Sequence, residues 1–297
     1  MSEQHCARIA LVGRPNVGKS TLLNACVGAG LAAVSQKAQT TRQQVIGVWT
    51  EGTTQLVFVD TPGQAPGEQQ TLNRLLDRNA VAALSEVDIV LWVREAGVER
   101  PADRTVAERI QQRQPGCLAI ALNKVDRVRD KAKLMPELHR LQQDYKPALL
   151  YPLSGRRPQD AARLCAELVK LAPAGDWHYP EDTLTPQRGE FLAAEKIREQ
   201  LFARLHQELP YRLAVTIDSM DEEPAALVVH ATVWLDRASH KPIVLGRGGG
   251  NLKQVREAAE AGLTALWQRP VRCHLWLKLR EGWAEDQAVI RTLGASD

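Results

Sequence analysis

The first residues whose types and spacing suggest chemistry lie at positions 13–20, which read Gly-Arg-Pro-Asn-Val-Gly-Lys-Ser. An apolar run, residues 9–12, precedes them, and a helical pattern follows from Ser20. The glycines let successive backbone N–H groups turn towards an anion, and a helix that begins there adds a favourable dipole. Lys19 would reach the β- and γ-phosphates of a nucleotide, and the Ser20 hydroxyl would bind Mg²⁺. The segment therefore predicts a phosphate-binding loop rather than a plain glycine turn.

A second candidate segment, Asp60-Thr61-Pro62-Gly63, ends the apolar run at residues 55–59. The Asp60 carboxylate would hold Mg²⁺ through a water molecule, and the backbone N–H of Gly63 would contact the γ-phosphate. A turn at the end of a strand uses the same residue types. This segment is therefore informative only together with the phosphate-binding loop.

A third segment, Asn123-Lys124-Val125-Asp126, follows another apolar run and distinguishes the purine bases. The Asp126 carboxylate can accept hydrogen bonds from the N1–H and the exocyclic amine of guanine, whereas adenine has a bare acceptor at N1. A polar site whose ligand lacks the matching groups loses orders of magnitude in affinity. Because all three segments follow candidate strands, where open α/β sheets bind ligands, the sequence predicts a guanine-nucleotide site.

Weaker candidates complete this site. Thr41 lies in a Thr-Thr-Arg segment where a loop would offer a hydroxyl to Mg²⁺, and Ser154-Gly155 follows the last candidate strand, where a backbone N–H would reach guanine O6. A plain polar loop is the alternative for the first of these. The residues expected to contact the nucleotide are Gly13, Arg14, Pro15, Asn16, Val17, Gly18, Lys19, Ser20, Thr21, Asp60, Thr61, Pro62, Gly63, Asn123, Lys124, Asp126, Ser154 and Gly155. Those expected to bind Mg²⁺ are Ser20, Thr41 and Asp60, and those expected to act on the transferred phosphate are Lys19, Thr41, Asp60 and Gly63.

A glycine cluster in the second half indicates a different ligand. Residues 246–249, Gly-Arg-Gly-Gly, precede a predicted helix and fit the GxxG loop with which KH domains approach four unpaired nucleotides. A flexible hinge is the alternative. The candidate RNA contacts are Lys241, Gly246, Arg247, Gly248, Gly249, Lys253 and Arg256. The basic members could equally form a solvated helix face.

The tryptophans of this half and the histidines of the whole chain indicate no further binding site. The tryptophans Trp234, Trp267, Trp276 and Trp283 lie in predicted strands and a helix, so we expect them to pack in the core rather than stack on bases. The seven histidines show no pair at metal-ligand spacing, so we expect no metal other than Mg²⁺.

The elements that must position these residues alternate in the first half. Apolar runs at residues 8–12, 55–59, 88–93, 116–122 and 148–152 are separated by helical windows at 71–84, 102–112, 133–143 and 160–171. This pattern predicts a doubly wound, mostly parallel sheet with helices on both faces. The second half reads helix 188–208, strands 211–218 and 226–235, helix 252–267 and strand 271–279, which predicts a small α+β unit. We expect domains at 1–172 and 188–297, joined by a proline-containing linker at 173–187.

Composition excludes several classes of protein. The 297 residues are 44% hydrophobic and 25% charged, as in ordinary globular chains. Five scattered cysteines lack a C-x-x-C pair, which is typical of free thiols in a reducing compartment. No apolar run approaches a membrane span and no secretory segment is recognised, so we expect a cytoplasmic protein. Residues 181–297 carry 15 Lys and Arg against 17 Asp and Glu, so RNA binding by this half depends on local charge placement.

The order GRPNVGKS, TTR, DTPG, NKVD and SG resembles the translation-factor-related GTPases. The segments YPED, FLAAEKIREQL, ELPY, the glycine loop and LWLKLREGWAEDQ narrow the resemblance to the Era family of ribosome-assembly GTPases, over nearly the whole chain. The resemblance implies a P-loop GTPase domain followed by a type II KH domain. It implies GTP and GDP as ligands with Mg²⁺, and the 3′ end region of small-subunit rRNA and the pre-30S subunit as partners.

Two departures from the family pattern concern the nucleotide site. The loop reads Ser154-Gly155-Arg156-Arg157, where the family more often has Ser-Ala followed by an acidic or polar residue and a Gly. A backbone N–H donor survives this change, but the loop need not keep the family's shape. Gln64 replaces a commonly apolar residue. A glutamine there resembles the water-orienting residue of Ras-like GTPases, although a surface side chain is the alternative.

The sequence thus predicts a GTP-hydrolysing switch that binds single-stranded rRNA and assists assembly of the small ribosomal subunit. Hydrolysis should be slow without a partner, because the intrinsic rates of switch GTPases are orders of magnitude below the assisted rates. No residue is an evident general base. Asn16 is a hypothetical ligand for K⁺. A related GTPase of tRNA modification or of membranes, and an RNA-binding module with an inert nucleotide domain, are the alternatives. We expect a monomer, and a peripheral contact with the inner face of the cell membrane is left open.

Overall fold

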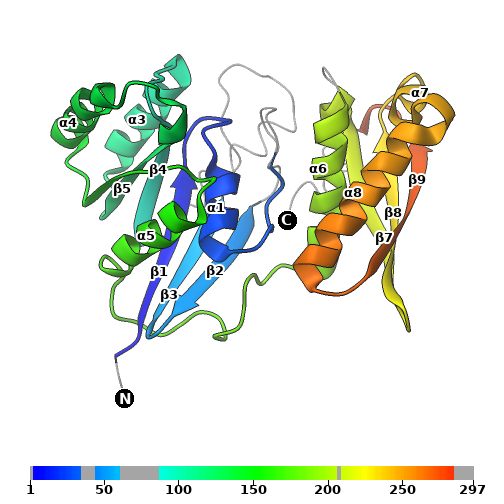
Figure 1. The fold of residues 1–297 in the computed structure, drawn as a ribbon, viewed down its shortest axis with the longest axis horizontal. Helices are drawn as coiled ribbons and strands as arrows, with labels where there is room; N and C mark the ends of the chain where they lie inside the picture. Colours follow the sequence, from blue (N-terminus) through cyan, green and yellow to red (C-terminus); the bar gives the residue numbers. More distant parts are fainter. Residues whose placement is uncertain (1–2, 35–43, 61–86, 206–208, 284–297) are drawn as a thin grey trace. The chain divides into compact units, whose positions relative to one another are not determined.

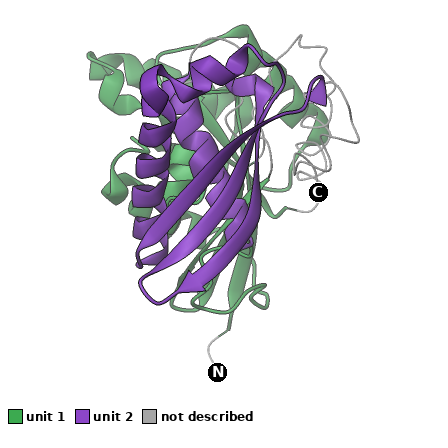
Figure 2. Ribbon diagram, turned by 90° about the vertical axis from the view of Figure 1, so that its right-hand side faces the viewer, with its two compact units in different colours: residues 1–32, 44–67, 77–186 green, residues 33–43, 68–76, 187–297 purple. Residues whose placement is uncertain are grey.

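The computed structural model describes residues 3–34, 44–60, 87–205 and 209–283 of the chain. The chain divides into two compact units, one within residues 1–32, 44–67 and 77–186 and the other within residues 33–43, 68–76 and 187–297 (Figures 1 and 2). Within these described ranges, no helix is both long and apolar enough to cross a membrane.

The first unit is built on a six-stranded sheet with the order β2-β3-β1-β4-β5-β6. Only β2 runs antiparallel to its neighbour. The strands are β1 (His5–Val12), β2 (Val45–Glu51), β3 (Thr54–Asp60), β4 (Ile89–Glu95), β5 (Leu118–Asn123) and β6 (Leu149–Pro152). The five predicted runs are thus confirmed as strands, whereas β2 was not predicted.

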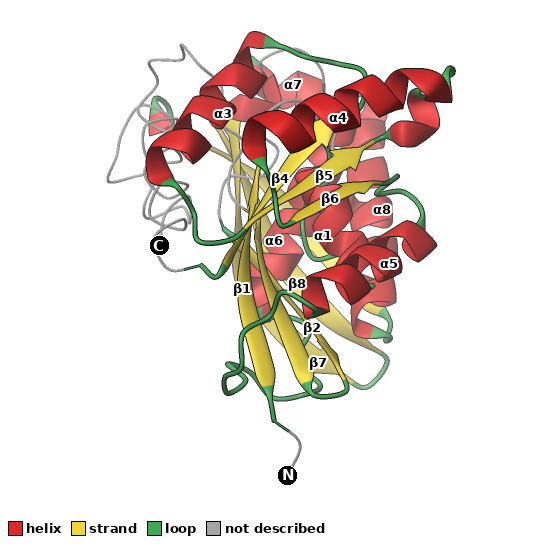
Figure 3. Cartoon of the chain, turned by 90° about the vertical axis from the view of Figure 1, so that its left-hand side faces the viewer, coloured by secondary structure: helices red, strands yellow, loops and turns green. Residues whose placement is uncertain are grey.

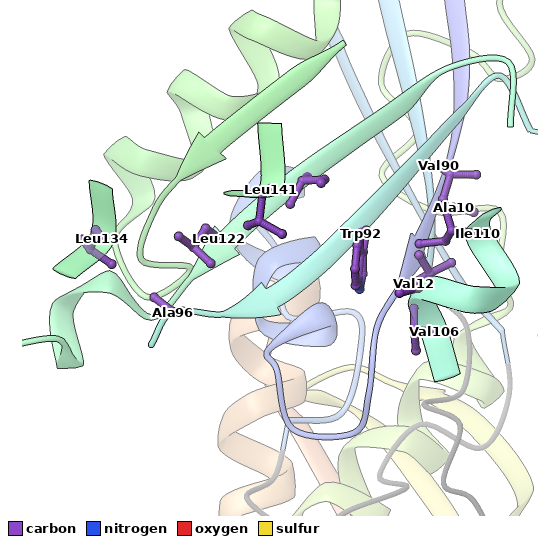
Figure 4. Packing of buried hydrophobic residues seen from close by; sticks show 12 residues of the cluster. Ala10, Val12, Val90, Trp92, Ala96, Val106, Ile110, Leu122, Leu134 and Leu141 are labelled. Atoms are coloured by element: carbon purple, nitrogen blue, oxygen red, sulfur yellow. The ribbon is translucent and has the colours of Figure 1, made fainter. Parts of the chain in front are cut away.

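Helices cover both faces of this sheet (Figure 3). They are α1 (Lys19–Val27), α3 (Pro101–Arg113), α4 (Leu134–Tyr145) and α5 (Pro158–Val169). On one face, Val106 and Ile110 of α3 and Leu141 of α4 pack on Trp92 of β4 in a buried cluster (Figure 4). On the other face, α1 and α5 pack on each other and on β3. The predicted mostly parallel α/β fold is confirmed, while the helical window at 71–84 lies outside the described residues.

The chain that follows α5 forms a strap, residues 172–185, along the first unit. Its beginning lies beside the start of β1, where the Cys6 N–H donates to Pro173 O at 3.1 Å and the Gly175 N–H donates to Gln4 O at 2.9 Å. Its end lies beside the edge strand β2. There the Val48 N–H donates to Leu184 O at 2.8 Å. Backbone groups of an edge strand otherwise invite pairing with another chain, so the strap protects this edge.

Gln55 of β3 anchors the middle of the strap from a fully buried position. Its Oε1 accepts hydrogen bonds from the N–H groups of His178 and Tyr179 at 3.0 and 3.1 Å, and its Nε2 donates to Tyr179 O at 2.9 Å. One side chain therefore satisfies three backbone groups of the strap.

Replacing Gln55 with Ala should loosen the strap, because these three backbone groups lose their buried partner. Each unsatisfied group costs about 1–3 kcal/mol, so the N–H groups of His178 and Tyr179 should exchange with solvent at least tenfold faster. Hydrogen exchange measured by mass spectrometry checks this. The control Gln143→Ala changes an exposed glutamine of α4 and should leave the strap protected; equal protection in Gln55→Ala would contradict the prediction.

The second unit is a three-stranded sheet with helices on one face. Strand β7 (Leu213–Glu223) pairs antiparallel with β8 (Ala226–Leu235), which pairs parallel with β9 (Val271–Leu279). The helices are α6 (Gly189–Arg204), α7 (His240–Leu245) and α8 (Gly250–Trp267), of which α7 was not predicted. A buried cluster joins Ile197 of α6 and Val255 of α8 to Val233 of β8. The predicted order of helix, two strands, helix and strand is confirmed.

The tryptophans of this unit do not all lie in its core. Trp283 is fully buried, as predicted, but Trp276 is 48% exposed, so the prediction of core packing is wrong for this residue. The reason is its register: on β9 the even-numbered side chains point away from the helices, and Trp276 is one of them.

Candidate functional site

The phosphate-binding loop connects the end of β1 to the start of α1 and depends on glycine at both ends. Gly13 has φ +150°, and a Cβ there would lie 2.4 Å from Val93 O; Gly18 has φ +103°, and a Cβ there would lie 2.5 Å from Asn123 Nδ2. The helix begins at Lys19. Its first N–H groups have no partner within the helix, which is the arrangement that binds phosphate.

Lys19 lies buried beneath this loop and is held by it. Its Nζ donates to Gly13 O at 2.9 Å and to Arg14 O at 3.3 Å. Burial lowers the pKa of Lys19, while the charge of Asp60 opposes that change and the charge of Arg14 adds to it. The loop therefore presents a cation next to the position that phosphate oxygens would take.

Ser20 and Asp60 meet although 40 residues separate them. The Ser20 hydroxyl donates to Asp60 Oδ2 at 2.5 Å, and Asp60 is the fully buried last residue of β3. A hydroxyl and a carboxylate are hard oxygen donors of the kind that Mg²⁺ prefers. These two predicted Mg²⁺ ligands are brought together and fit the metal. The other predicted residues of this part, Thr41, Thr61, Pro62, Gly63 and Gln64, lie outside the described residues.

Asn123 joins three loops at the carboxyl end of β5. Its Nδ2 donates to Val17 O at 2.9 Å, and its Oδ1 accepts hydrogen bonds from the N–H groups of Lys124 and Gly155 at 2.7 and 2.8 Å. The side chain is buried. The phosphate loop, the Asn-Lys-Val-Asp segment and the loop after β6 are therefore fixed to one another, as a site that holds phosphate and base together requires.

Asp126 is exposed at the rim of the same site, in a short 3₁₀ turn, Val125–Arg127. A hydrogen bond from Ser154 lowers the pKa of Asp126, and this effect outweighs the small opposing effect of burial. The carboxylate is therefore held ionised as an acceptor. The N–H of Ser154 donates to Asp160 Oδ2 at 2.9 Å and that of Gly155 to Asn123, so their contact with guanine O6 stays a prediction.

An ionic network below the loop was not predicted. Arg14 is buried and donates to Asp103 Oδ2 at 3.0 Å and to Glu95 Oε2 at 2.7 Å. Lys124 Nζ lies 3.0 Å from Glu95 Oε2 and donates to Asn16 O at 2.5 Å. Burial alone would raise the pKa of Glu95, but hydrogen bonds from Arg14 and Lys124 lower it overall.

This network ties the phosphate loop to the base-binding segment through a single carboxylate. The available signal in the sequence was Glu95 itself, an acidic residue that ends an otherwise apolar strand. Of the remaining predicted contacts, Pro15, Asn16 and Val17 lie on the phosphate loop, where Asn16 has φ +65°, and Thr21 lies in the first turn of α1. The hypothesis that Asn16 binds K⁺ stays a prediction.

The glycine loop of the second unit lies between α7 and α8 and forms a short 3₁₀ turn, Arg247–Gly249. Gly246, Gly248 and Gly249 have positive φ angles, and a Cβ at Gly246 would lie 2.6 Å from Asn251 Cβ. Arg247 and Gly248 are exposed at its tip. The loop can therefore bring its backbone close to a ligand, as the GxxG motif requires.

The four predicted cations around this loop are not equivalent. Lys241 and Arg247 are exposed. Lys253 lies 3.8 Å from Glu257 and Arg256 lies 3.8 Å from Glu260, each one turn along α8. Part of the basic cluster is thus already offset by carboxylates. Ile243, which is 55% exposed on α7, adds an exposed apolar side chain that was not predicted.

Two family models match the chain, one in each unit. The family described as 50S ribosome-binding GTPase matches residues 8–124, and the KH domain family matches residues 208–284. The predicted P-loop GTPase fold followed by a KH domain is confirmed by these matches and by the solved structures below.

Curated relatives and solved structures are similar to this chain over nearly its whole length. GTPase Era of Pseudomonas putida is 39% identical over 292 residues, which are 98% of this chain and 97% of that protein; the Pseudomonas fluorescens protein is likewise 39% identical over 98% of this chain and 97% of its own length. Era from Aquifex aeolicus, a tyrosine-to-alanine variant solved with GDP and AlF₄⁻, has a TM-score of 0.93 at 29% identity and covers 99% of this chain and 100% of its own. An Era structure with MgGDPNP and nucleotides 1506–1542 of 16S ribosomal RNA gives the same TM-score, identity and coverage. With both domains in the same order and this identity over nearly its full length, the chain belongs to the Era family of GTPases.

Proposed function

We propose that this chain is a switch that binds and hydrolyses GTP, binds the single-stranded 3′ end region of small-subunit rRNA, and assists assembly of the small ribosomal subunit. The proposal is supported by one combination of features. The chain has the contacts of Ser20 with Asp60 and of Asn123 with Val17 O at the nucleotide site, and it also has the GxxG loop. It resembles, over nearly its full length, an Era protein solved with both MgGDPNP and 16S rRNA.

The nucleotide contacts are proposed from the convergence of loops at one end of the sheet. The N–H groups of residues 13–20 and the Lys19 ammonium would hold the phosphates, and Asp126 would select guanine. Ser20 and Asp60 would hold Mg²⁺, which would neutralise charge on the β- and γ-phosphates. We propose Thr41 as a third ligand of Mg²⁺, the Gly63 N–H as a γ-phosphate contact and Gln64 as the residue that orients water. Hydrolysis without a partner is expected to be slow.

We also propose domain bounds of 1–172 and 188–297 with a connection at 173–187. The bounds are supported by the change of fold between α5 and α6 and by the separate family matches. A role in small-subunit assembly places the protein in the cytoplasm, and a peripheral membrane contact stays a prediction.

The RNA contact is tested by the double variant Arg247→Asp, Gly248→Asp. It replaces a cation and a glycine at the exposed tip of the loop with carboxylates. Because each phosphate contact adds to affinity and to its salt dependence, we expect affinity for a fluorescent single-stranded rRNA oligonucleotide to fall about tenfold or more. The affinity for GDP should be unchanged, because no nucleotide contact is altered.

The matched control is Arg237→Asp, Ala238→Asp, which makes the same change of charge in an exposed loop after β8. It should bind RNA like the wild type. Equal RNA affinity of the wild type and the Arg247 and Gly248 variant at moderate salt would contradict the loop contact, and absence of GDP binding by the wild type would contradict the switch. Titrating the RNA oligonucleotide against protein bound to GDPNP and against protein bound to GDP measures the coupling between nucleotide and RNA binding. A tenfold difference in RNA affinity between the two states corresponds to a coupling free energy of about 1.4 kcal/mol.

A further inference from the structure

The sheet of the second unit has a face that its helices do not cover. Helix α6 packs on β7 and α8 packs on β9, both through the side of the sheet that contains Val229, Ala231 and Val233. Figure 2 shows the opposite face of this sheet towards the viewer. Along the edge strand β9, the side chains on this opposite face are all exposed and comprise Arg272, His274, Trp276 and Lys278.

Three rings gather on this face. His230 of β8 lies opposite His274 of β9 in the register, and their ring centroids are 5.0 Å apart with planes only 15° from parallel. The ring of Trp276 lies 5.7 Å from that of His230 and 5.9 Å from that of His274. Rings normally bury their large apolar area, yet Trp276 is 48% exposed. The cluster therefore presents aromatic surface to solvent.

A fourth ring continues the cluster along β8. Trp234 donates its Nε1–H to Thr216 Oγ1 at 2.9 Å, and the ammonium of Lys278 lies 5.7 Å from the ring centroid. The hydrogen bond fixes the ring, and the cation lies over its face. We call His230, Trp234, His274 and Trp276, with Arg272 and Lys278, the ring face.

The charges of the ring face are divided between its strands. Arg272 and Lys278 lie on β9, and across the described residues neither forms an ion pair with a carboxylate. The carboxylates lie on β7. Asp218 accepts from the Thr232 hydroxyl at 2.7 Å, and Asp221 accepts from the Ser219 hydroxyl at 2.8 Å and lies 3.5 Å from His230 Nε2. Glu223, opposite Ala226, is exposed. The β9 side of the face therefore combines exposed rings with available positive charge.

We propose that the ring face is a second contact surface for single-stranded RNA, separate from the GxxG loop. It rests on the proposed function, because it extends the RNA bound by this domain. Bases stack on exposed aromatic rings whatever their sequence, and cations beside the rings contact the phosphates. An apolar protein partner suits the surface less, because the outward positions of β9 from residue 272 to residue 278 carry no aliphatic side chain. The described residues hold no group of three metal ligands, so the histidines are not explained by a metal site.

The variant Trp276→Ala tests the proposal with two fluorescent RNAs, a 6-mer and a 24-mer of the same composition. A KH groove holds about four nucleotides, so the 6-mer fills only the groove and the 24-mer can also reach the ring face. Since loss of base stacking lowers affinity substantially, we expect affinity for the 24-mer to fall about tenfold and affinity for the 6-mer to stay unchanged. The Arg247→Asp, Gly248→Asp variant should weaken both.

The matched control is Leu279→Ala, a change on the same strand at a side chain of similar exposure, 46%, on the other face of the sheet. It should bind both RNAs like the wild type. A 24-mer of abasic nucleotides should bind wild type and Trp276→Ala equally; a tenfold difference there would show that Trp276 affects affinity without stacking on a base and would overturn the proposal.

Photocrosslinking keeps the test independent of any effect of the substitution on folding. A 24-mer with 4-thiouridine should crosslink wild-type protein within residues 271–279, and absence of that crosslink would overturn the proposal. If the wild type binds neither RNA, the proposed RNA function fails as a whole. If it binds both and Trp276→Ala equals it, only the ring face is refuted.

Discussion

Asp126→Asn should lower the affinity for GDP by about 10⁴-fold, because a site built to hydrogen-bond a ligand rejects one that lacks the matching groups by that order. The Asp126 carboxylate offers only acceptors, and the hydrogen bond from Ser154 holds its pKa below the ordinary value. An asparagine would place an N–H₂ donor against one of the two guanine donors. Calorimetry with GDP measures the loss directly.

The same substitution should improve binding of xanthosine diphosphate, since xanthine has an oxygen acceptor where guanine has its amine. Asp130→Asn is the matched control, because it makes the same change in an exposed residue of the next turn and should not alter GDP affinity. Unchanged GDP affinity in Asp126→Asn, or equal binding of GDP and ADP by the wild type, would refute the assignment.

The ionisation of Asp126 also predicts the pH dependence of guanine selectivity. A carboxylate with a lowered pKa stays charged until the pH falls through that lowered value. Selectivity for GDP over ADP should therefore persist from pH 8 to pH 5, which the same calorimetry can follow.

Asn123→Ala should have the second largest effect, on stability and binding together. It removes one buried donor and one acceptor that together bond Val17 O and the N–H groups of Lys124 and Gly155. At about 1–3 kcal/mol for each buried group left unsatisfied, the free energy of unfolding of the first unit should fall by at least about 3 kcal/mol. GDP affinity should fall at least 100-fold, because the phosphate loop and the base-binding loop are no longer fixed to each other.

Urea denaturation with and without GDP checks both parts of this prediction. Asn251→Ala serves as the control, since Asn251 lies in the second unit, where its side chain donates to Ile243 O at 3.2 Å. A wild-type GDP affinity in Asn123→Ala would show that the three loops hold their positions without this side chain.

Much of the fold followed from apolar periodicity. The strands that carry Asp60 and Asn123 are buried along their length and read as nearly continuous apolar runs, which is typical of a sheet covered on both faces. Strand β2 was missed because Gly47 interrupts its pattern. The structure gives the reason for the glycine: a Cβ there would lie 2.7 Å from Val27 Cγ2 of α1. A close approach of helix and strand is a tertiary requirement that a strand pattern does not reveal.

Site residues could be predicted where they belong to a recognisable motif. Residues whose role depends on a partner far away in the sequence were missed. Ser20 and Asp60 were assigned to one metal and lie in contact. By contrast, the pairing of Arg14 with Asp103 joins residues 89 positions apart that belong to no shared motif. Trp276 was misplaced for a related reason, since its exposure depends on which face of β9 the helices cover.

Because the strap is hydrogen-bonded to the first unit, it shortens the free connection between the first and the second unit. The Thr185 hydroxyl donates to Ile46 O at 2.6 Å, four positions before α6 begins at Gly189. The connection to the second unit is thus anchored on β2, the edge strand of the first unit's sheet, so tension along the connection acts first on this strand.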